Sequence, residues 1–258
     1  MTDLRHGDAD TTLDLDVIAA QLEALEESIM YRFIDRAQFA WNPRAYEVGA
    51  ESLAGASDVS LFDARLRAQE ELDARFGRYL VPEERPFTDG LPEAERSVAG
   101  GHAALKASDW NVVRQTAGIA SAYRGTLPAL CEHRDDGHYG SSVEHDVSVL
   151  QAVSRRVHFG ALYVAEAKFR QRPEAYTTAI QYGRPGDIEQ LLTRPAVEQA
   201  IVERLTTKMQ DLQADVHTRV RRVIPPDVVV GFYRETIIPL TKAGQIAYLL
   251  QRLEHEES

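Results

Sequence analysis

The spacing of the prolines constrains this 258-residue chain more than any other feature of its sequence. Proline breaks the interior of a helix, although the first turn of a helix tolerates it. Only Pro43 precedes position 82, and only Pro128 lies between positions 93 and 172. The other prolines gather in two groups, at 82–92 and at 173–239. The stretches between these groups are therefore free to form long helices.

Apolar residues recur along these stretches at spacings of three and four, the period of one face of an α-helix. Asp14 or Asp16 is placed to cap the first helix, and Pro195 is a suitable first residue for another. The segment 227–253 is also helical in pattern, and Pro239 is expected to kink or break it. The three clearest stripes are Ile18, Leu22, Leu25, Ile29 and Phe33; Val143, Val147, Leu150, Val153 and Val157, in a helix continuing to about Phe169; and Val197, Ile201, Leu205, Met209, Leu212, Val216 and Val220.

No alternating pattern typical of β-strands competes with these helices. We therefore predict an all-α fold in which residues 1–258 form a single intertwined helical domain. Most residues of the apolar stripes are expected to be ordinary core. The segment 81–108 is the best candidate for a long surface connection between helices.

The charge and the cysteine count limit the partners and the compartment. Asp and Glu number 40 and Lys and Arg 29, so the formal net charge is −11. Nucleic acid and anionic membranes bind basic surfaces, so neither is expected as the main partner. Cys131 is the single cysteine and has no internal partner for a disulfide. With a polar start and no apolar run of about 18 residues, these features favour a reducing, cytoplasmic compartment.

Common catalytic and metal-binding motifs are absent from the sequence. It contains no GxxxxGK[ST], GxSxG, HExxH or CxxC. Two clusters of potential metal ligands are better explained as solvated segments, and His158 as a packed core histidine. We therefore predict no metal and no cofactor. The two clusters are Asp8, Asp10 and Asp14, and Cys131, His133, Asp135, Asp136 and His138.

One segment is far more specific, namely LQAVSRRVHFGALYVAEAKF from Leu150 to Phe169. It closely resembles the signature helix of the fungal- and plant-type all-helical chorismate mutases. The resemblance is collinear over nearly the whole chain and is weak only between about 88 and 108. It extends to Leu13–Phe39, to YGS at Tyr139–Ser141, to Ala196–Thr206 and to Tyr233–Glu254.

The resemblance implies the conversion of chorismate to prephenate, a unimolecular Claisen rearrangement that requires no metal or cofactor. The substrate is a dicarboxylate, so its binding requires cations, and donors aimed at the ether oxygen stabilise the transition state. By resemblance, Arg156 binds a carboxylate, Lys168 binds the ether oxygen and a carboxylate, and Glu198 accepts from the ring hydroxyl. Thr241 is implied to hydrogen-bond a carboxylate. Arg194 is a further candidate for substrate binding, at a position where the sequence departs from the family.

Three positions depart from the family pattern. Ala19 replaces an arginine that binds a carboxylate of the substrate in the family, and Arg194 replaces an asparagine. Arg194 either restores the missing charge, adapts the pocket to another ring substituent, or only pairs with Glu198 one turn later. Gln245 replaces the glutamate of the fungal enzymes, and its amide donates a hydrogen bond at any pH. It is therefore predicted as the second donor to the ether oxygen.

The spacing of two predicted site residues also departs from the family. Arg156 and Lys168 are 12 residues apart, one more than in the family. In a regular α-helix this extra residue places the two side chains about 120° apart. A π-bulge near Gly160–Tyr163 absorbs an inserted residue and returns both side chains to one face. We therefore predict such a bulge.

The resemblance also implies a homodimer with an aromatic amino-acid effector site at its interface. Arg78, Gly140 and Ser141 match positions of that site, whereas Gly77 and Glu144 replace its other arginine and a threonine. Loss of this control is therefore expected. Two alternative functions remain at this point: an enzyme acting on a modified chorismate or isochorismate, and a non-catalytic relative that only binds a ligand or a partner.

Overall fold

The computed structural model describes residues 13–51, 57–97, 104–107, 109–182 and 185–256, and these residues form helices and connections without a β-strand. The all-α prediction is therefore confirmed. The longer helices in the first half are α1 (Leu15–Arg36), α2 (Leu61–Arg75), α3 (Thr116–Leu130) and α4 (Tyr139–Phe159), with 3₁₀ turns η1 (Pro43–Tyr46), η2 (Arg78–Leu80) and η3 (Trp110–Val113) between them. The second half contains α5 (Ala165–Gln171), α6 (Pro173–Gln181), α7 (Pro185–Leu192), α8 (Pro195–Ala214), α9 (Pro226–Phe232) and α10 (Ile238–Glu256).

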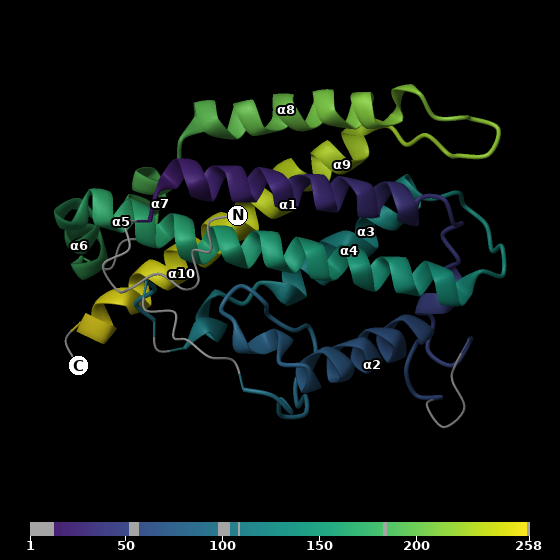
Figure 1. Ribbon diagram of the computed structural model, residues 1–258, viewed down its shortest axis with the longest axis horizontal. Coiled ribbons are helices and arrows are strands. Elements are labelled where there is room, and N and C mark those ends of the chain that lie inside the picture. The colour runs from purple at the N-terminus through teal and green to yellow at the C-terminus, as the bar shows by residue number, and fades with distance from the viewer. Residues whose placement is uncertain (1–12, 52–56, 98–103, 108, 183–184, 257–258) are drawn as a thin grey trace.

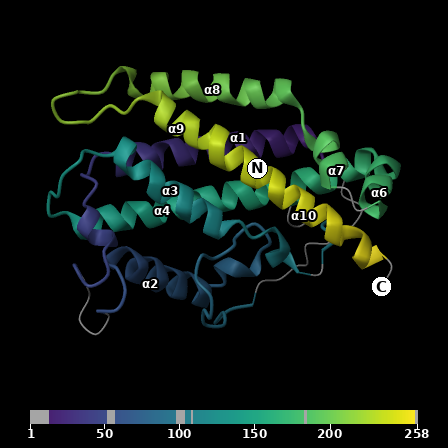
Figure 2. The ribbon, with the colours of Figure 1, turned by 180° about the vertical axis from the view of Figure 1, so that it is seen from behind.

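Two π-helical segments join helices end to end. The segment η4 (Gly160–Val164) continues α4 into α5, and η5 (Tyr233–Ile237) continues α9 into α10. The resulting long rods and α1 run through the centre of the molecule, with α8 along the outside of α1 and α2 along the outside of α4 (Figure 1). Seen from behind, α9 and α10 cross the other helices obliquely (Figure 2).

Most residues of the first two predicted apolar stripes are buried in the core, whereas in the third stripe only Leu205 and Met209 are fully buried and Val197 is 52% exposed. Ile29, Phe33 and Val153 lie in one buried cluster, and Ile18 and Leu162 lie in a second one. Because α1, the α4–α5 rod and the α9–α10 rod contribute to both clusters, the same long elements connect the two parts of the core. Asp14 caps α1 as predicted, since its carboxylate accepts from the Asp16 amide at 2.8 Å.

The predicted helix through Val220 was too long. Pro195 begins α8 as expected, but the helix ends at Ala214, and Val220 is 84% exposed in the following turn. The side chain of Gln213 explains the change of direction. Its amide donates to the Ile224 carbonyl at 3.0 Å and accepts from the Ile224 amide at 2.9 Å, so it ties the returning chain to the end of α8.

Two further expectations about connections were wrong in part. The helix is not broken at Pro239. Its regular α-helical hydrogen bonding is interrupted instead at the π segment η5, which ends two residues before that proline.

The described part of 81–108 is not a simple surface connection, since Glu84 and Arg85 are buried. Arg85 donates to the carbonyl groups of Tyr79 in η2 and of Val81, and Glu84 pairs with Arg155 on α4. These contacts hold the segment against the helices.

Among the described helices, none combines the length and apolar character needed to cross a bilayer.

Candidate active site

A cavity of about 330 Å³ lies between α1, the α4–α5 rod, α8 and α10. The sequence predicted six catalytic or substrate-binding residues, and all six line this cavity although they are spread over 90 positions, from 156 to 245. They are Arg156, Lys168, Arg194, Glu198, Thr241 and Gln245.

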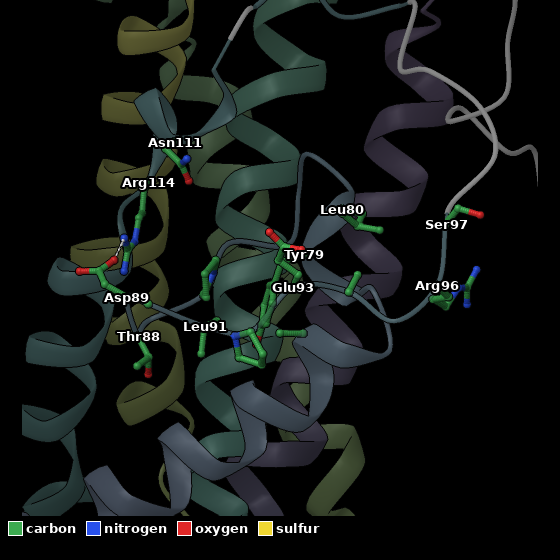
Figure 3. A pocket seen from close by; sticks show the side chains of 15 residues that line it. Tyr79, Leu80, Thr88, Asp89, Leu91, Glu93, Arg96, Ser97, Asn111 and Arg114 are labelled. Carbon is green, nitrogen blue, oxygen red and sulfur yellow. Dashed lines mark hydrogen bonds and ion pairs between the residues drawn. The ribbon is translucent and has the colours of Figure 1, made fainter.

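A larger hollow of about 770 Å³ lies on another part of the molecule, beside η2 and the segment 86–97 (Figure 3). Its lining contains none of the six predicted residues. Arg114, on its wall, is already paired with Asp89 at 2.5 Å, as the dashed line in Figure 3 shows. The smaller cavity is therefore the candidate active site.

The predicted π-bulge is present and explains how two cations share this cavity. Residues Gly160–Val164 form a π-helix between two α-helical segments. The wider turn absorbs the extra residue, so Arg156 before it and Lys168 after it both line the cavity. The π-bulge prediction is confirmed.

Arg156 is buried and held by a carboxylate from α1. Its Nη2 lies 3.4 Å from Oε1 of Glu26, and the other oxygen of Glu26 accepts from Arg204 at 2.8 Å. Arg156 is 4% exposed and Glu26 is 1% exposed. The Nε atoms of both arginines are buried without a hydrogen-bond partner in the structure. A buried, incompletely paired guanidinium facing a cavity is suited to binding an anion.

Lys168, on α5, lines the same cavity in a partly desolvated position. Its Nζ donates to the Leu192 carbonyl at 2.7 Å. Burial, and after it the nearby positive charge of Arg194, lowers the pKa of Lys168 to about 8. Glu198 pairs with Lys242 at 3.0 Å, so its ion-pair partner is Lys242 and not Arg194, which was one of the alternatives for that arginine.

The first turns of α10 place two polar side chains, Thr241 and Gln245, beside Gly160 at the start of the π segment η4. Thr241 is buried and donates to the Ile237 carbonyl at 2.7 Å. Gln245 is buried and its Nε2 donates to the Gly160 carbonyl at 3.1 Å. This close approach depends on Gly160, because a Cβ at that residue would lie 2.8 Å from Thr241 Cγ2.

Comparison with known proteins agrees with this geometry. No family model matches the chain. The chorismate mutase of Emericella nidulans is 36% identical to it over 260 residues, covering 96% of each chain. This chain belongs to the chorismate mutase family. The crystal structure of a Candida albicans chorismate mutase in complex with L-Trp superposes with a TM-score of 0.88 at 31% identity, covering 99% of this chain and 97% of the other. That of the chloroplast chorismate mutase of Zea mays gives 0.84 at 37% identity, covering 96% and 98%.

Relative to the chorismate mutase pattern identified in the sequence, Ala19 and Arg194 replace the expected arginine and asparagine, and both residues line the cavity. Ala19 is on α1, and Arg194 is the residue before the first turn of α8. The side chain of Arg194 is exposed. The loss of one cation on α1 is thus accompanied by a cation at another wall of the same cavity.

The residues that match the effector site of the chorismate mutases do not meet within one chain. Arg78 pairs with Asp73 at 2.9 Å and with Glu84 at 3.0 Å. Asp73 also accepts from Gln151, in the middle of α4, whereas Ser141 and its neighbour Gly140 lie in the exposed first turn of that helix. Ten residues of α-helix between Ser141 and Gln151 span about 15 Å. A site using all three would require a second chain.

The potential metal ligands have other roles where the structure describes them. Asp14 caps α1, and the Asp136 carboxylate accepts from Asn42 and from the Ala40 amide. Asp8 and Asp10 lie outside the described residues. The described residues contain no group of three or more His, Cys, Asp or Glu suited to a metal ion. His158 is fully buried, and burial lowers its pKa to about 3, so it is a neutral core residue as predicted.

Sequence reasoning missed five charged residues that line the site, namely Asp16, Glu23, Glu26, Arg204 and Lys242. Glu26 had a detectable signal, because it falls on the apolar face of α1 between Leu22 and Ile29. A carboxylate in an apolar stripe usually has a buried cationic partner. The partnership of Lys242 with Glu198 had no local signal, since 44 residues separate them.

Proposed function

We propose that this protein is a chorismate mutase that converts chorismate to prephenate with the six predicted residues of the 330 Å³ cavity. The observation that carries the proposal is the meeting of Arg156, Lys168 and Gln245 at one cavity, across a π segment that the altered spacing requires. Membership of the family supports the same conclusion independently.

The proposed mechanism requires binding and electrostatics alone. Chorismate carries two carboxylates, and holding both fixes the conformer in which the bond-forming carbons approach each other. Arg156 binds one carboxylate, and Arg194 supplies the charge that Ala19 lacks. Thr241 is a further donor to the substrate when its hydroxyl turns away from the Ile237 carbonyl. The bond between the ring carbon and the ether oxygen breaks as a carbon–carbon bond forms in the same step. No atom leaves or enters the substrate.

The rate increase is assigned to two donors aimed at the ether oxygen. That oxygen gains negative charge in the transition state, so the Lys168 ammonium and the Gln245 amide bind the transition state more strongly than the substrate. Glu198 accepts from the ring hydroxyl. Lys242 pairs with Glu198, and a carboxylate that already has a cationic partner suits a neutral hydroxyl donor better than a second cation.

The experiment is a chorismate-consumption assay with identification of the product. Prephenate formation at kcat/KM of at least about 10⁴ M⁻¹s⁻¹, the lower range for enzymes acting on their own substrates, supports the proposal. Because Ala19 and Arg194 alter the cavity, the same assay is run on isochorismate and on 4-amino-4-deoxychorismate. A much higher kcat/KM on either would assign the protein to a modified chorismate. Binding of chorismate without turnover would make it a non-catalytic relative.

We also propose that the chain folds as a single domain and that two copies of it form a homodimer. Leu72, Phe76 and Leu80 are spaced by four residues at the end of α2 and in η2, and they are 51%, 68% and 41% exposed. A row of exposed apolar side chains is typical of an interface. Light scattering coupled to size exclusion is expected to give twice the chain mass of 28.8 kDa. We further propose a reducing compartment, since Cys131 is a buried free thiol.

A further inference from the structure

The contact between Gln245 and Gly160 joins a predicted catalytic side chain to a backbone carbonyl of the π segment. Nε2 of Gln245 lies 3.1 Å from the Gly160 oxygen, and the two residues are 85 positions apart. Gln245 also lines the active-site cavity, and its side chain is 7% exposed. The carbonyl therefore contacts the same amide that is assigned to the substrate.

The contact is possible because two glycines let α10 approach the π segment. A Cβ at Gly160 would lie 2.8 Å from Thr241 Cγ2 and 3.1 Å from Arg156 Nη1. A Cβ at Gly244, the neighbour of Gln245, would lie 2.7 Å from the Cβ of Ala161. Real Cβ atoms essentially never show contacts under 3.0 Å. Any side chain at either glycine would thus push α10 away from the carbonyl.

The carbonyl decides which end of the Gln245 amide faces it. A carbonyl oxygen only accepts hydrogen bonds, whereas a glutamine side chain has one end that donates and one that accepts. If the amide were flipped, Oε1 would lie about 3.1 Å from the Gly160 oxygen, and two acceptors would repel each other without a proton between them. Nε2 carries two hydrogens, so one satisfies the carbonyl and the other remains for an acceptor in the cavity.

We propose that the Gly160 carbonyl is a positioning group for the reaction, which fixes the Gln245 amide with its nitrogen toward the substrate's ether oxygen. The assignment of the ether oxygen as the second acceptor rests on the proposed function, whereas the hydrogen bond between Gln245 and Gly160 does not. The carbonyl also restricts what position 245 accepts. A glutamate there keeps the contact only while protonated, because an ionised carboxylate has no hydrogen to donate.

The positive and negative charges of the other groups around the cavity nearly balance. They therefore do not reverse the preference for a protonated glutamate at position 245. The cations are Arg156, Lys168, Arg194, Arg204 and Lys242. The anions are Asp16, Glu23, Glu26 and Glu198. With five positive and four negative groups, burial and the carbonyl oxygen are left to favour the protonated form of a glutamate at 245.

The test observes the Gly160 carbonyl directly by NMR. Glycine labelled with ¹³C at its carbonyl and alanine labelled with ¹⁵N give a signal only for Gly–Ala pairs, and the sequence has three, at 49–50, 55–56 and 160–161. The first two serve as internal controls. The measurement is made on the full chain from pH 5 to 9 for the wild type, Gln245→Glu and Gln245→Met. kcat/KM is measured on the same samples.

We expect the Gly160 signal of the wild type to stay constant with pH. In Gln245→Met it should be displaced, because the donor is lost, and should not titrate. In Gln245→Glu it should titrate with an apparent pKa above about 4.3, the ordinary value for glutamate. Above that pKa, kcat/KM of this variant should fall about tenfold per pH unit. The two control signals should not move.

Two results would overturn the proposal. A Gly160 signal that is unchanged in Gln245→Met and does not titrate in Gln245→Glu refutes the contact, and wild-type turnover of chorismate would then leave the proposed function intact. A signal that titrates while kcat/KM of Gln245→Glu stays level refutes the role of Gln245 at the ether oxygen. Absence of any chorismate turnover by the wild type refutes the proposed function itself.

Discussion

Replacement of Gly160 by alanine is expected to lower activity strongly while leaving the protein folded. Gly160 has helical dihedral angles, so alanine alone would gain about 0.5–1 kcal/mol in helix stability. The new Cβ, however, would lie 2.8 Å from Thr241 Cγ2, about 1 Å inside the usual carbon–carbon separation of about 3.8 Å. Overpacking of this size costs about 1–3 kcal/mol. The net destabilisation is therefore at most about 2.5 kcal/mol, which lowers Tm by about 5–10 °C.

Activity depends on the direction of the displacement. Thr241 and Arg156 are both touched by the added carbon and both line the cavity, so relief of the overlap moves them by about 1 Å. A misplacement of that size costs about 100-fold in rate. We expect Gly160→Ala to lower kcat/KM for chorismate by about 100-fold at a temperature well below its Tm. Steady-state kinetics and thermal unfolding by circular dichroism measure the two effects.

Gly118→Ala is the matched control. Its Cβ would meet only the tip of Leu240, at 3.2 Å and 3.3 Å, on a different face of α10. A flexible leucine side chain moves aside, so kcat/KM should stay within about twofold of wild type while the helix gains about 0.5–1 kcal/mol. Wild-type kcat/KM in Gly160→Ala, or an equal loss in both variants, would refute the argument that residue 160 must lack a side chain for Thr241 and Arg156 to keep their positions in the cavity.

Three further outcomes are expected. The alkaline limb of kcat/KM should lie near pH 8, because Lys168 donates only while protonated and its pKa is lowered to about 8; a limb above pH 10 would contradict this. Arg194→Ala should lower kcat/KM by about 10- to 100-fold, as loss of a charge-assisted hydrogen bond does, and should move that limb to higher pH; no change in either quantity would place Arg194 outside the substrate site. Treatment with EDTA should leave kcat/KM unchanged, and activity lost with EDTA and restored by a divalent cation would contradict a mechanism without metal.

Several local features of the protein were determined by its sequence alone. Proline positions and apolar periodicity located the long helices, because both act within a few residues through backbone geometry. The cap at Asp14 and the start of α8 at Pro195 follow from the same short-range chemistry. Even the π segment could be predicted, because the family resemblance requires Arg156 and Lys168 to share one pocket, and a separation of 12 positions does not place both on one face of a regular α-helix.

The tertiary structure alone decided how charged and polar groups meet. Periodicity at Val220 suggested helix, but a long-range bond from Gln213 turned the chain at the end of α8. The pairing of Lys242 with Glu198 and the contact of Gln245 with Gly160 each join distant segments. Burial and charge coupling depend on which helices pack together, and a pattern of nearest neighbours along the chain does not contain that information. The sequence therefore identified six residues that line one cavity, and packing determined their partners and the pKa of Lys168.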